Sequence, residues 1–404
     1  MKILIVNKFL YANGGSETYI FNLGKQLENM GNEIQYFGMD HPNKIVGNQW
    51  NCYTGNMDFH SGRWSRILYP FKIIFSYEAY TKILFLLKKF DPDAVHINNF
   101  NFQLTPSILY AIKHWEKQRK RKLPIIMTAH DSQLVCPNHL MMIPSTGEIC
   151  FKCEGGKFGY CVKNKCIHNS KIRSILAGFE GLLYQFLRTY RKIDLLVCPS
   201  IFMKKKLSTN KDLAEKAVVM HNFVERKMDI RVTKKDKYIL YFGRYSKEKG
   251  IETLLNICRE MPDVPFVFAG DGPLKEEVCN LPNIIEKGFL TGEELYDTIA
   301  RARLVVFPSE CNENCPLSVM EAQIYGTPVF GSRIGGIPEL IQDGINGRLL
   351  EAGNVEEWKS AIYNIWSDAS KLDEYAANCQ KVEYQTAEQY CKSLLQKIQG
   401  LMGE

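Results

Sequence analysis

The chain has 404 residues, of which 45% are hydrophobic and 24% are charged. This length favours two domains, and this composition excludes disordered, collagen-like and coiled-coil chains. The net charge of +7 is unevenly spread: residues 1–250 carry 39 Lys and Arg against 20 Asp and Glu, whereas residues 251–404 carry 12 against 24. The basic first half is therefore expected to face an anionic partner.

Short hydrophobic runs alternate with helical patterns along the first half of the chain. The run Lys2–Val6 leads through Gly14 and Gly15 into a helix that is predicted to begin near Glu17. The alternation of strand and helix predicts a parallel sheet that is covered by helices on both faces. Further predicted strands are Glu33–Phe37, Ala94–Ile97, Pro124–Thr128, Leu195–Cys198 and Ala217–Met220.

A second set of alternating elements follows the charged patch Thr233–Lys237. We predict two doubly wound, Rossmann-like α/β domains that face each other across a cleft, residues 1–225 and residues 226–404, with a Cys-rich insert at 136–168 in the first. Ligands of such sheets bind in the loops that follow the strands, so we expect the chemistry there. The strands predicted in the second half are Lys237–Phe242, Val264–Ala269, Leu304–Phe307 and Pro328–Gly331, with a helix at Gly250–Cys258.

The most informative loop precedes a predicted helix that starts at Pro316, a residue that suits the first helical position. The backbone amides of Leu317 and Ser318 would then be free to bind a phosphate or diphosphate. Glu313 in the loop and Glu321 inside the helix could accept hydrogen bonds from hydroxyls at the two ends of one ligand. A capped helix with two solvated glutamates is the simpler alternative.

A second loop of interest is Gly243–Gly250, directly after a strand. Its glycines allow close approach of a ligand to the backbone. Arg244 and Lys249 could neutralise a departing diphosphate, the kind of charge stabilisation that dominates many transfer reactions. The spacing is not that of a Walker A loop, and a solvated basic turn is the alternative.

Taken together, these motifs resemble the retaining, two-domain glycosyltransferases of family 4. The resemblance covers nearly the whole chain in order and implies a GT-B fold, with a nucleotide diphosphate sugar (UDP or GDP) bound mainly by the second domain. The motifs are Gly14–Glu17, Gly243–Gly250, Ala269-Gly-Asp-Gly-Pro273, the pair Glu313 and Glu321 with seven residues between them, and Gly335–Glu339.

The resemblance also implies roles for single residues on the donor side. Glu321 would bind the ribose hydroxyls and Glu313 the transferred sugar, while Arg244 and Lys249 would hold the diphosphate. The backbone near Phe289-Leu290 would bind the base.

On the other side of the donor, the resemblance brings the backbone of Gly15 close to the phosphate and places His130 near the transferred sugar. A tight turn and a capping histidine, respectively, are the alternatives without a ligand. The Gly14-Gly15 pair does not match G-x-G-x-x-G, which counts against a nicotinamide cofactor.

Two groups of residues could suggest a metal. Asp91-Pro-Asp93 matches an Asp-x-Asp motif, but a helix stopped by Pro92 explains it better, and we expect no catalytic metal. By contrast, four clustered cysteines have the composition of a structural zinc site, with reduced thiols or an iron–sulfur centre as alternatives. They are Cys150, Cys153, Cys161 and Cys166, and Cys136 lies nearby in the sequence.

Two basic segments, Ile112–Lys122 and Ser170–Lys192, suit an anionic membrane surface. The second places large apolar residues at helical spacing between basic flanks, as interfacial helices do, although a core-packed helix is the alternative. Nucleic acid is not expected, because no nucleic-acid-binding motif accompanies the charge. No apolar run approaches a membrane span and Asn7 interrupts the first run too early for a signal peptide, so we expect a cytoplasmic, peripheral protein at the inner face of the plasma membrane.

We therefore expect a retaining glycosyltransferase that moves a hexose from a nucleotide diphosphate sugar to a hydroxyl of a lipid-linked glycan. Surface polysaccharide, lipopolysaccharide or capsule, is the expected pathway. A sugar-nucleotide epimerase on the same fold and a non-catalytic nucleotide-sugar-binding protein are the alternatives.

Overall fold

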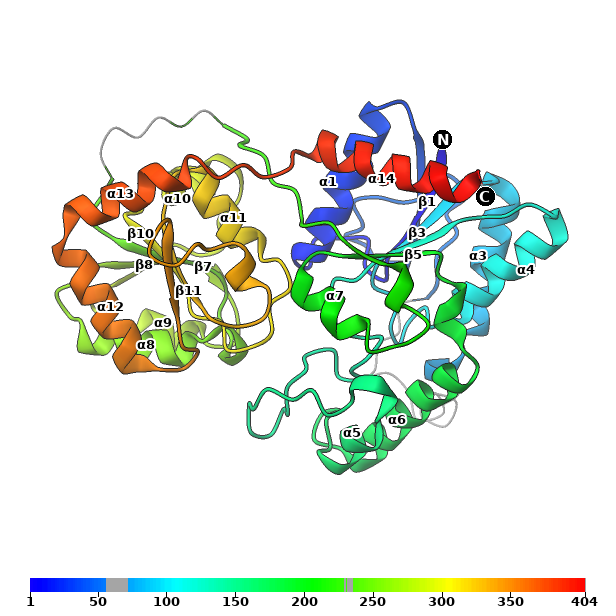
Figure 1. Ribbon diagram of the computed structural model, residues 1–404, viewed down its shortest axis with the longest axis horizontal. Helices are drawn as coiled ribbons and strands as arrows, with labels where there is room; N and C mark the ends of the chain where they lie inside the picture. The colour runs from blue at the N-terminus through cyan, green and yellow to red at the C-terminus, as the bar shows by residue number, and fades with distance from the viewer. Residues whose placement is uncertain (56–71, 229, 231–234, 404) are drawn as a thin grey trace. The chain divides into compact units, whose positions relative to one another are not determined.

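A computed structural model of the chain describes residues 1–55, 72–228, 230 and 235–403. It divides the chain into two compact units (Figure 1). Unit 1 consists of Met1–His221 and Ala387–Glu404, and unit 2 consists of Asn222–Thr386. No helix among the described residues combines the length and the apolar character needed to pass through a bilayer.

Unit 1 is built on a six-stranded parallel sheet in the order β2-β1-β3-β4-β5-β6. After β1 the chain adds β2 on one side, and it then adds β3 and the later strands on the other side. The loops that follow β1 and β3 therefore run in opposite directions, which makes this position the topological switch point of the sheet. The middle strands β3, β4 and β5 are buried throughout, as runs rich in Val, Ile and Leu require. The strands are β1 (Lys2–Val6), β2 (Glu33–Phe37), β3 (Ala94–Ile97), β4 (Ile125–Thr128), β5 (Leu195–Cys198) and β6 (Ala217–Val219).

Helices join these strands. They are α1 (Gly15–Asn29), α3 (Tyr77–Phe90), α4 (Ser107–Arg119) and α7 (Ile201–Leu207), and between β4 and β5 lie α5 (Gly159–Lys163) and α6 (Lys171–Phe186). The predicted insert, residues 136–168, contributes α5, which packs with the following helix α6 in a small helical layer that Figure 1 shows at the lower end of unit 1.

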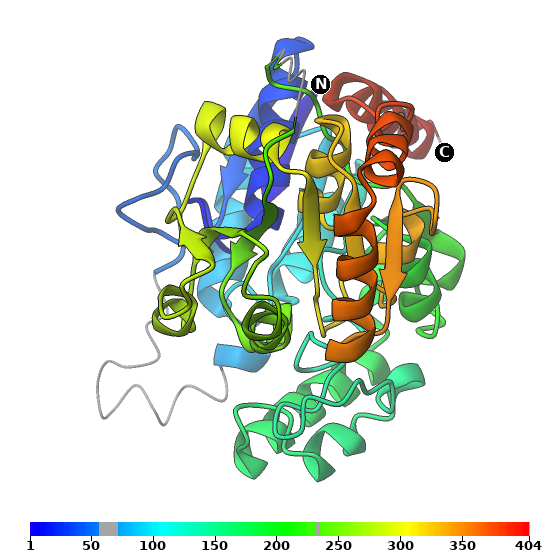
Figure 2. The ribbon, with the colours of Figure 1, turned by 90° about the vertical axis from the view of Figure 1, so that its left-hand side faces the viewer.

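Unit 2 has the same type of sheet in the order β12-β11-β10-β7-β8-β9, with its switch point between β7 and β10. In Figure 2, where unit 2 faces the viewer, its strands run side by side with helices packed around them. The elements are β7 (Ile239–Arg244), α8 (Ile251–Glu260), β8 (Phe266–Asp271), α9 (Lys275–Cys279), β9 (Ile284–Glu286), α10 (Gly292–Arg301), β10 (Leu304–Phe307), α11 (Leu317–Ile324), β11 (Val329–Ser332), β12 (Gly347–Leu350), α12 (Val355–Ser367) and α13 (Ala369–Cys379).

Alternate residues of β7 enter two different hydrophobic cores. Ile239 and Tyr241 pack with side chains of α8 and α12, whereas Leu240 and Phe242 pack with side chains of α10 and α11. Because successive side chains of a strand point to opposite faces, both faces of the sheet are covered by helices. The predicted α/β class with two Rossmann-like sheets is confirmed.

The final helix, α14 (Ala387–Met402), belongs to unit 1, which differs from the predicted assignment of residues 226–404 to the second domain. Its buried face packs against α1, where the hydroxyls of Tyr390 and Tyr19 lie 2.8 Å apart. Figure 1 shows the two helices side by side. The amphipathic pattern of α14 is visible in the sequence, but the pattern does not say which sheet the apolar face covers.

Candidate active site

An ion pair joins two loops of unit 2 that follow β7 and β10, the strands on either side of the switch point. Nζ of Lys249, after β7, lies 2.5 Å from Oε1 of Glu313, after β10. The hydroxyl of Ser309 donates to the same carboxylate oxygen at 2.7 Å. Burial tends to lower the pKa of Lys249, but the charge of Glu313 outweighs it and holds this pKa above its ordinary value. Lys249 therefore stays protonated and fixed in place at the carboxyl edge of the sheet, with its charge balanced there by Glu313.

Glycines hold these loops in contact. Gly250 has a φ of 73°, and a Cβ there would lie 1.9 Å from the carbonyl oxygen of Pro308. Gly335 has a φ of 60°, and a Cβ there would lie 2.3 Å from the carbonyl oxygen of Glu313. That same oxygen accepts a hydrogen bond from the amide of Gly336 at 2.7 Å. Only glycine fits such approaches, so these residues fix the position of Glu313.

Arg244 lies at the end of β7, at the same edge of the sheet. Its side chain is exposed, while its carbonyl oxygen accepts a hydrogen bond from the hydroxyl of Tyr241 at 2.8 Å. This bond anchors the backbone and leaves the guanidinium available to a ligand. Arg244 and Lys249 therefore come from one loop, as predicted, and of these two it is Lys249 that pairs with an acid in the part of the chain that the structure describes.

The helix α11 begins at Leu317, one residue later than predicted. Pro316 flanks the helix in an extended conformation, with ψ of 119°, and its side chain makes no capping hydrogen bond to the first turn. The amides of Leu317 and Ser318 therefore stand at an uncapped, positive helix end, as an anion site requires.

Glu321 lies one turn into α11 in surroundings different from those of Glu313. Burial raises the pKa of the Glu321 carboxyl to about 7, with Lys227 opposing the shift. The rings of Tyr296 and Tyr325, which stack at 5.3 Å between centroids, are coupled electrostatically to the same carboxyl. Glu321 is thus an acid that exchanges its proton near neutral pH.

Phe289 and Leu290 follow β9 and differ in the exposure of their side chains. Phe289 is 77% exposed, whereas the side chain of Leu290 is buried in the core with Leu240 and Ile299. Just before them, the carbonyl of Gly288 accepts from the amide of Gly270 at 2.7 Å. The backbone and the Phe289 ring can therefore meet a ligand here, whereas the Leu290 side chain cannot.

In unit 1, Gly15 is the first residue of α1 at the switch point of that sheet. A Cβ at Gly15 would meet no atom within 4 Å, so the space beside it is open. The neighbouring Glu17 is buried and accepts hydrogen bonds from Asn7 and Ser16, each at 3.0 Å. The hydrogen bonds of Glu17 thus fix the loop, while Gly15 is exposed to solvent.

His130 follows β4 as predicted and is a neutral group. Its Nε2 lies 2.9 Å from Oδ1 of Asn98, and its ring meets the edge of Tyr19 at 4.9 Å between centroids. Burial lowers the pKa of His130 to about 4, against the opposing charge of Asp131. Because the Asn98 oxygen can only accept, Nε2 carries the proton and Nδ1 has a lone pair.

Sequence reasoning missed the polar residues that support this edge of unit 1. The amide of Asn99 donates to Oδ1 of Asn7 at 3.0 Å, and its side-chain nitrogen donates to Ser16 at 3.1 Å. Within the described residues the buried Oδ1 of Asn99 has no hydrogen-bond partner, so it could accept from a ligand. The available signal was an asparagine placed directly after each of two buried strands.

Three of the four cysteines predicted to bind zinc lie in one small core. The side chains of Cys153, Cys161 and Cys166 are buried there with Phe158. Burial raises the pKa of the Cys153 thiol to about 12. Thiols suit zinc, but across the described parts of the chain no three or more His, Cys, Asp or Glu residues are grouped so as to hold a metal ion. The zinc site at these residues and Cys150 stays a prediction.

The Asp91-Pro-Asp93 segment is structural. Asp91 ends α3 in a left-handed conformation and pairs with Arg121 at 3.1 Å, and Asp93 accepts from the amide of Lys2 at 2.7 Å. Both carboxylates are thus engaged at the amino-terminal edge of the sheet, opposite to His130 and Gly15, which confirms the interpretation of Pro92 as a helix stop.

Residues 13–227, more than half of the chain, match Glycosyltransferase Family 4, and residues 224–382 match Glycosyl transferases group 1. A GDP-mannose-dependent alpha-mannosyltransferase of Corynebacterium glutamicum is 36% identical over 162 residues, which are 40% of this chain and 39% of that protein. Sulfoquinovosyl transferase SQD2 of Arabidopsis thaliana is 30% identical over 200 residues, 44% of this chain and 39% of that protein. The matched segments thus span about two fifths of these relatives' length.

Solved structures share the fold over the full length of the chain. Anabaena Alr3699/HepE in complex with UDP and glucose has a TM-score of 0.66 at 16% identity, covering 99% of this chain and 100% of that one. Sucrose-phosphate synthase of Thermosynechococcus elongatus has a TM-score of 0.69 at 16% identity, covering 100% and 99%. The two Rossmann-like units are those of the predicted GT-B fold, and the chain belongs to glycosyltransferase family 4.

Proposed function

We propose that this chain is a retaining glycosyltransferase that moves a hexose from a UDP- or GDP-sugar to a hydroxyl of a lipid-linked glycan. The observation that carries the proposal is the pairing of Lys249 with Glu313 at the switch point of unit 2, beside the uncapped start of α11. The names of similar proteins support the donor class, because one relative depends on GDP-mannose and one similar structure contains UDP and glucose.

The proposed donor roles follow from charge and position. Arg244, Lys249 and the amides of Leu317 and Ser318 hold the diphosphate, since they form the positive part of this edge. Glu313 binds the transferred sugar through the carboxylate oxygen that Lys249 does not occupy.

The proposed contacts to the nucleoside are made farther along unit 2. Glu321 accepts from the ribose hydroxyls, and the backbone around Phe289 and Leu290 meets the base.

The proposed reaction proceeds on one face of the sugar. The bond between the anomeric carbon and the diphosphate oxygen breaks, the acceptor oxygen bonds to the same carbon, and the acceptor proton passes to the leaving diphosphate. Arg244 and Lys249 stabilise the charge that develops on this leaving group. On the side of unit 1, Gly15 leaves room for the phosphate, and the neutral His130 hydrogen-bonds the transferred sugar without adding charge.

The first experiment is a thermal-shift screen of the full chain with UDP, GDP, ADP and their sugars. A ligand that binds the native state raises the melting temperature by mass action. We expect UDP or GDP and its sugar to give the largest shift, and nucleotide release to depend on an added glycan acceptor. A donor that is rearranged without any acceptor would instead identify a sugar-nucleotide epimerase, and tight donor binding without turnover would identify a binding protein.

The proposed acceptor and pathway place the reaction at a membrane. A lipid-linked glycan used for surface polysaccharide is reached at the inner face of the plasma membrane, which fits the basic character of residues 1–250.

A further inference from the structure

The helix α6 buries its small residues against unit 1. Ser174, Ala177 and Gly178 are buried on one face, and a Cβ added at Gly178 would lie 3.2 Å from Val162 of α5. A Cβ at Gly181 would lie 2.8 Å from the Phe158 ring. These small residues let the helix backbone lie directly on α5, so little space is left for large side chains on this face.

The large apolar residues of α6 point the other way, into solvent. Five of them are spaced by three or four residues from Ile172 to Phe186, which places them in one stripe along the helix, and Leu187 extends this stripe directly after the last helical residue. Their exposed fractions run from 47% to 84%, the reverse of the burial expected for a helix on a globular protein. The stripe, called the α6 stripe below, consists of Ile172, Ile175, Phe179, Leu182, Phe186 and Leu187.

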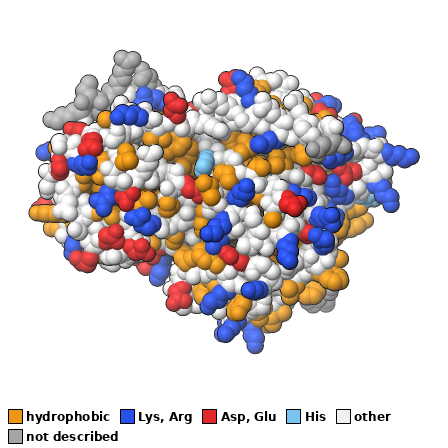
Figure 3. Space-filling view, viewed as in Figure 1, with side chains coloured by type: hydrophobic (Ala, Val, Ile, Leu, Met, Phe, Trp, Pro, Cys, Tyr) orange, Lys and Arg blue, Asp and Glu red, His pale blue; other side chains and the backbone are white. Residues whose placement is uncertain are grey.

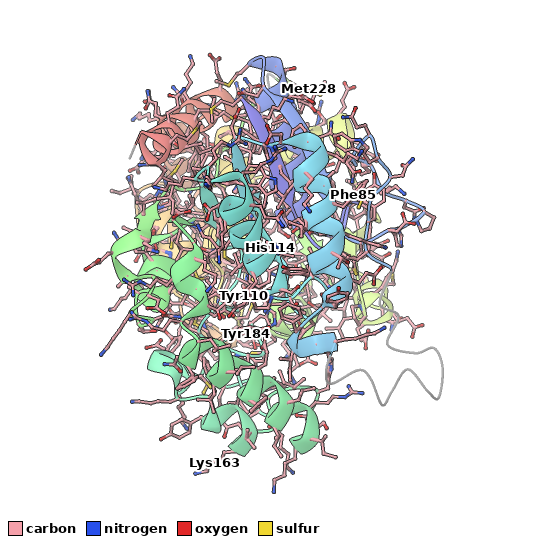
Figure 4. All side chains as sticks on the ribbon, turned by 90° about the vertical axis from the view of Figure 1, so that its right-hand side faces the viewer. Phe85, Tyr110, His114, Lys163, Tyr184 and Met228 are labelled. Carbon is pink, nitrogen blue, oxygen red and sulfur yellow. The ribbon has the colours of Figure 1, made fainter. Side chains whose placement is uncertain are left out.

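Tyr184 ties the helix to the rest of unit 1. Figure 4 shows its side chain directed from α6 toward Tyr110 of α4, and its hydroxyl bonds to the carbonyl oxygen of Ile74. Ser170 caps the first turn by accepting from the amide of Arg173 at 3.4 Å. The α6 stripe is therefore held outward by a capped, anchored helix.

The surroundings of the α6 stripe are strongly basic. Residues 149–192 carry nine Lys and Arg against two Asp and Glu. Of these acids, Glu154 is paired with Lys206 at 2.9 Å, and burial raises the pKa of Glu180 to about 8, so that it is mostly uncharged at neutral pH.

The basic residues border the stripe rather than interrupt it. Lys171 and Arg173 are exposed where α6 begins, and Lys163 extends outward from the end of α5 (Figure 4). In Figure 3 hydrophobic and basic side chains lie together in the lower part of the molecule, where Figure 1 shows α5 and α6. An apolar stripe with basic borders complements a bilayer surface with anionic head groups.

We propose that α6 is an interfacial helix, lying in the plane of an anionic bilayer with the α6 stripe among the acyl chains and the basic residues at the head groups. A second copy of this chain is a poorer occupant, because a symmetric contact would bring two basic borders together. The inference deepens the proposed function, on which it rests for its purpose, by naming the surface that brings unit 1 to a lipid-linked acceptor.

The test is flotation of the full chain with vesicles of neutral phosphatidylcholine and with vesicles that also contain phosphatidylglycerol. We expect binding to the anionic vesicles, weakened by high salt. The variant with Ile172→Ser, Phe179→Ser and Phe186→Ser should lower the bound fraction about tenfold. The matched control replaces three large exposed residues elsewhere, each at least half exposed, Ile45→Ser, Ile345→Ser and Tyr363→Ser, and should bind like the native chain.

A second variant separates charge from helix formation. Lys171→Glu with Arg173→Glu places acids in the first turn of α6, which the helix dipole favours, so the helix should remain while the preference for anionic vesicles is lost. The circular dichroism and the melting temperature of each variant confirm that it folds.

Equal flotation with both kinds of vesicle, or equal binding by the α6 stripe variant and its control, would overturn the proposal. A dimer that becomes monomeric in the α6 stripe variant, with no vesicle binding by either protein, would instead identify an interface between copies. Because flotation needs no donor, a chain that floats but binds no nucleotide contradicts the proposed function alone.

Discussion

The contact between Lys249 and Glu313 joins two loops 64 residues apart, and it does so through one carboxylate oxygen shared with Ser309. The ammonium of Lys249 is therefore in position before any ligand arrives. Preorganised charge of this kind acts without reorganisation when a leaving group forms.

Removing the cation should destabilise unit 2. Lys249→Ala leaves Glu313 partly buried without its partner, so we expect a loss of about 1–3 kcal/mol in the free energy of unfolding, measured by urea denaturation. Lys247→Ala is the control, because Lys247 pairs with Glu252 on the surface and should change stability by less than about 1 kcal/mol. Equal losses in both variants would show that the pair does not stabilise the loops.

Removing the exposed guanidinium of Arg244 should lower the turnover rate without changing the stability of the fold. Arg244→Ala should lower kcat about 100-fold, as loss of a charge-stabilising donor does, with an unchanged melting temperature. The control is Arg259→Ala in α8, whose guanidinium bonds to Asn256 on the surface. Native turnover in Arg244→Ala would contradict its proposed role.

The raised pKa of Glu321 predicts a dependence of stability on pH. Because the folded-state pKa of about 7 lies above the ordinary value of 4.5, the folded state holds this proton more tightly than the unfolded state. The contribution of protonated Glu321 to the free energy of unfolding is complete below about pH 4.5, falls as pH rises and is lost above about pH 7.

Comparison of native protein with Glu321→Gln measures this dependence. The variant has no proton to lose, so the difference in unfolding free energy between the two should change from pH 5 to pH 8 in its favour. If the unfolding free energies of the two proteins changed in parallel over that pH range, Glu321 would not be buried as described.

The insert supplies a further test. Cys161 is fully buried beside Cys166, and Cys161→Ser places a hydroxyl in that core, so we expect a lower melting temperature. Cys279→Ser, at an exposed thiol, should melt like the native chain. Metal analysis of both proteins tests the zinc prediction: a ratio near one that falls in Cys161→Ser would support it, and a ratio near zero in anaerobically purified native protein would reject it.

Sequence patterns located the buried strands well, because runs such as Ala94–Ile97 and Leu304–Phe307 have no other stable place than a covered sheet. They missed β9 and β12. Ile284–Glu286 is only three residues long and partly exposed, and Gly347–Leu350 begins with Gly and Arg, so neither has the hydrophobic signal of a strand.

The sequence named candidate residues for the site but did not predict the contacts between them. The sequence put Lys249 and Glu313 in two separate loops that each follow a strand, yet the ion pair depends on how the glycines at 250 and 335 let those loops approach. The surroundings of Glu321 and the outward face of α6 follow from tertiary packing, which decides whether an apolar periodicity meets a core or solvent.

The return of α14 to unit 1 bears on how the chain folds during synthesis. Unit 2 is one continuous stretch, so every residue it needs has been translated before α14 is made. Unit 1 is discontinuous, and its Tyr19 lacks the partner hydroxyl of Tyr390 until then. On the ribosome the unit that starts first should therefore be the last to mature.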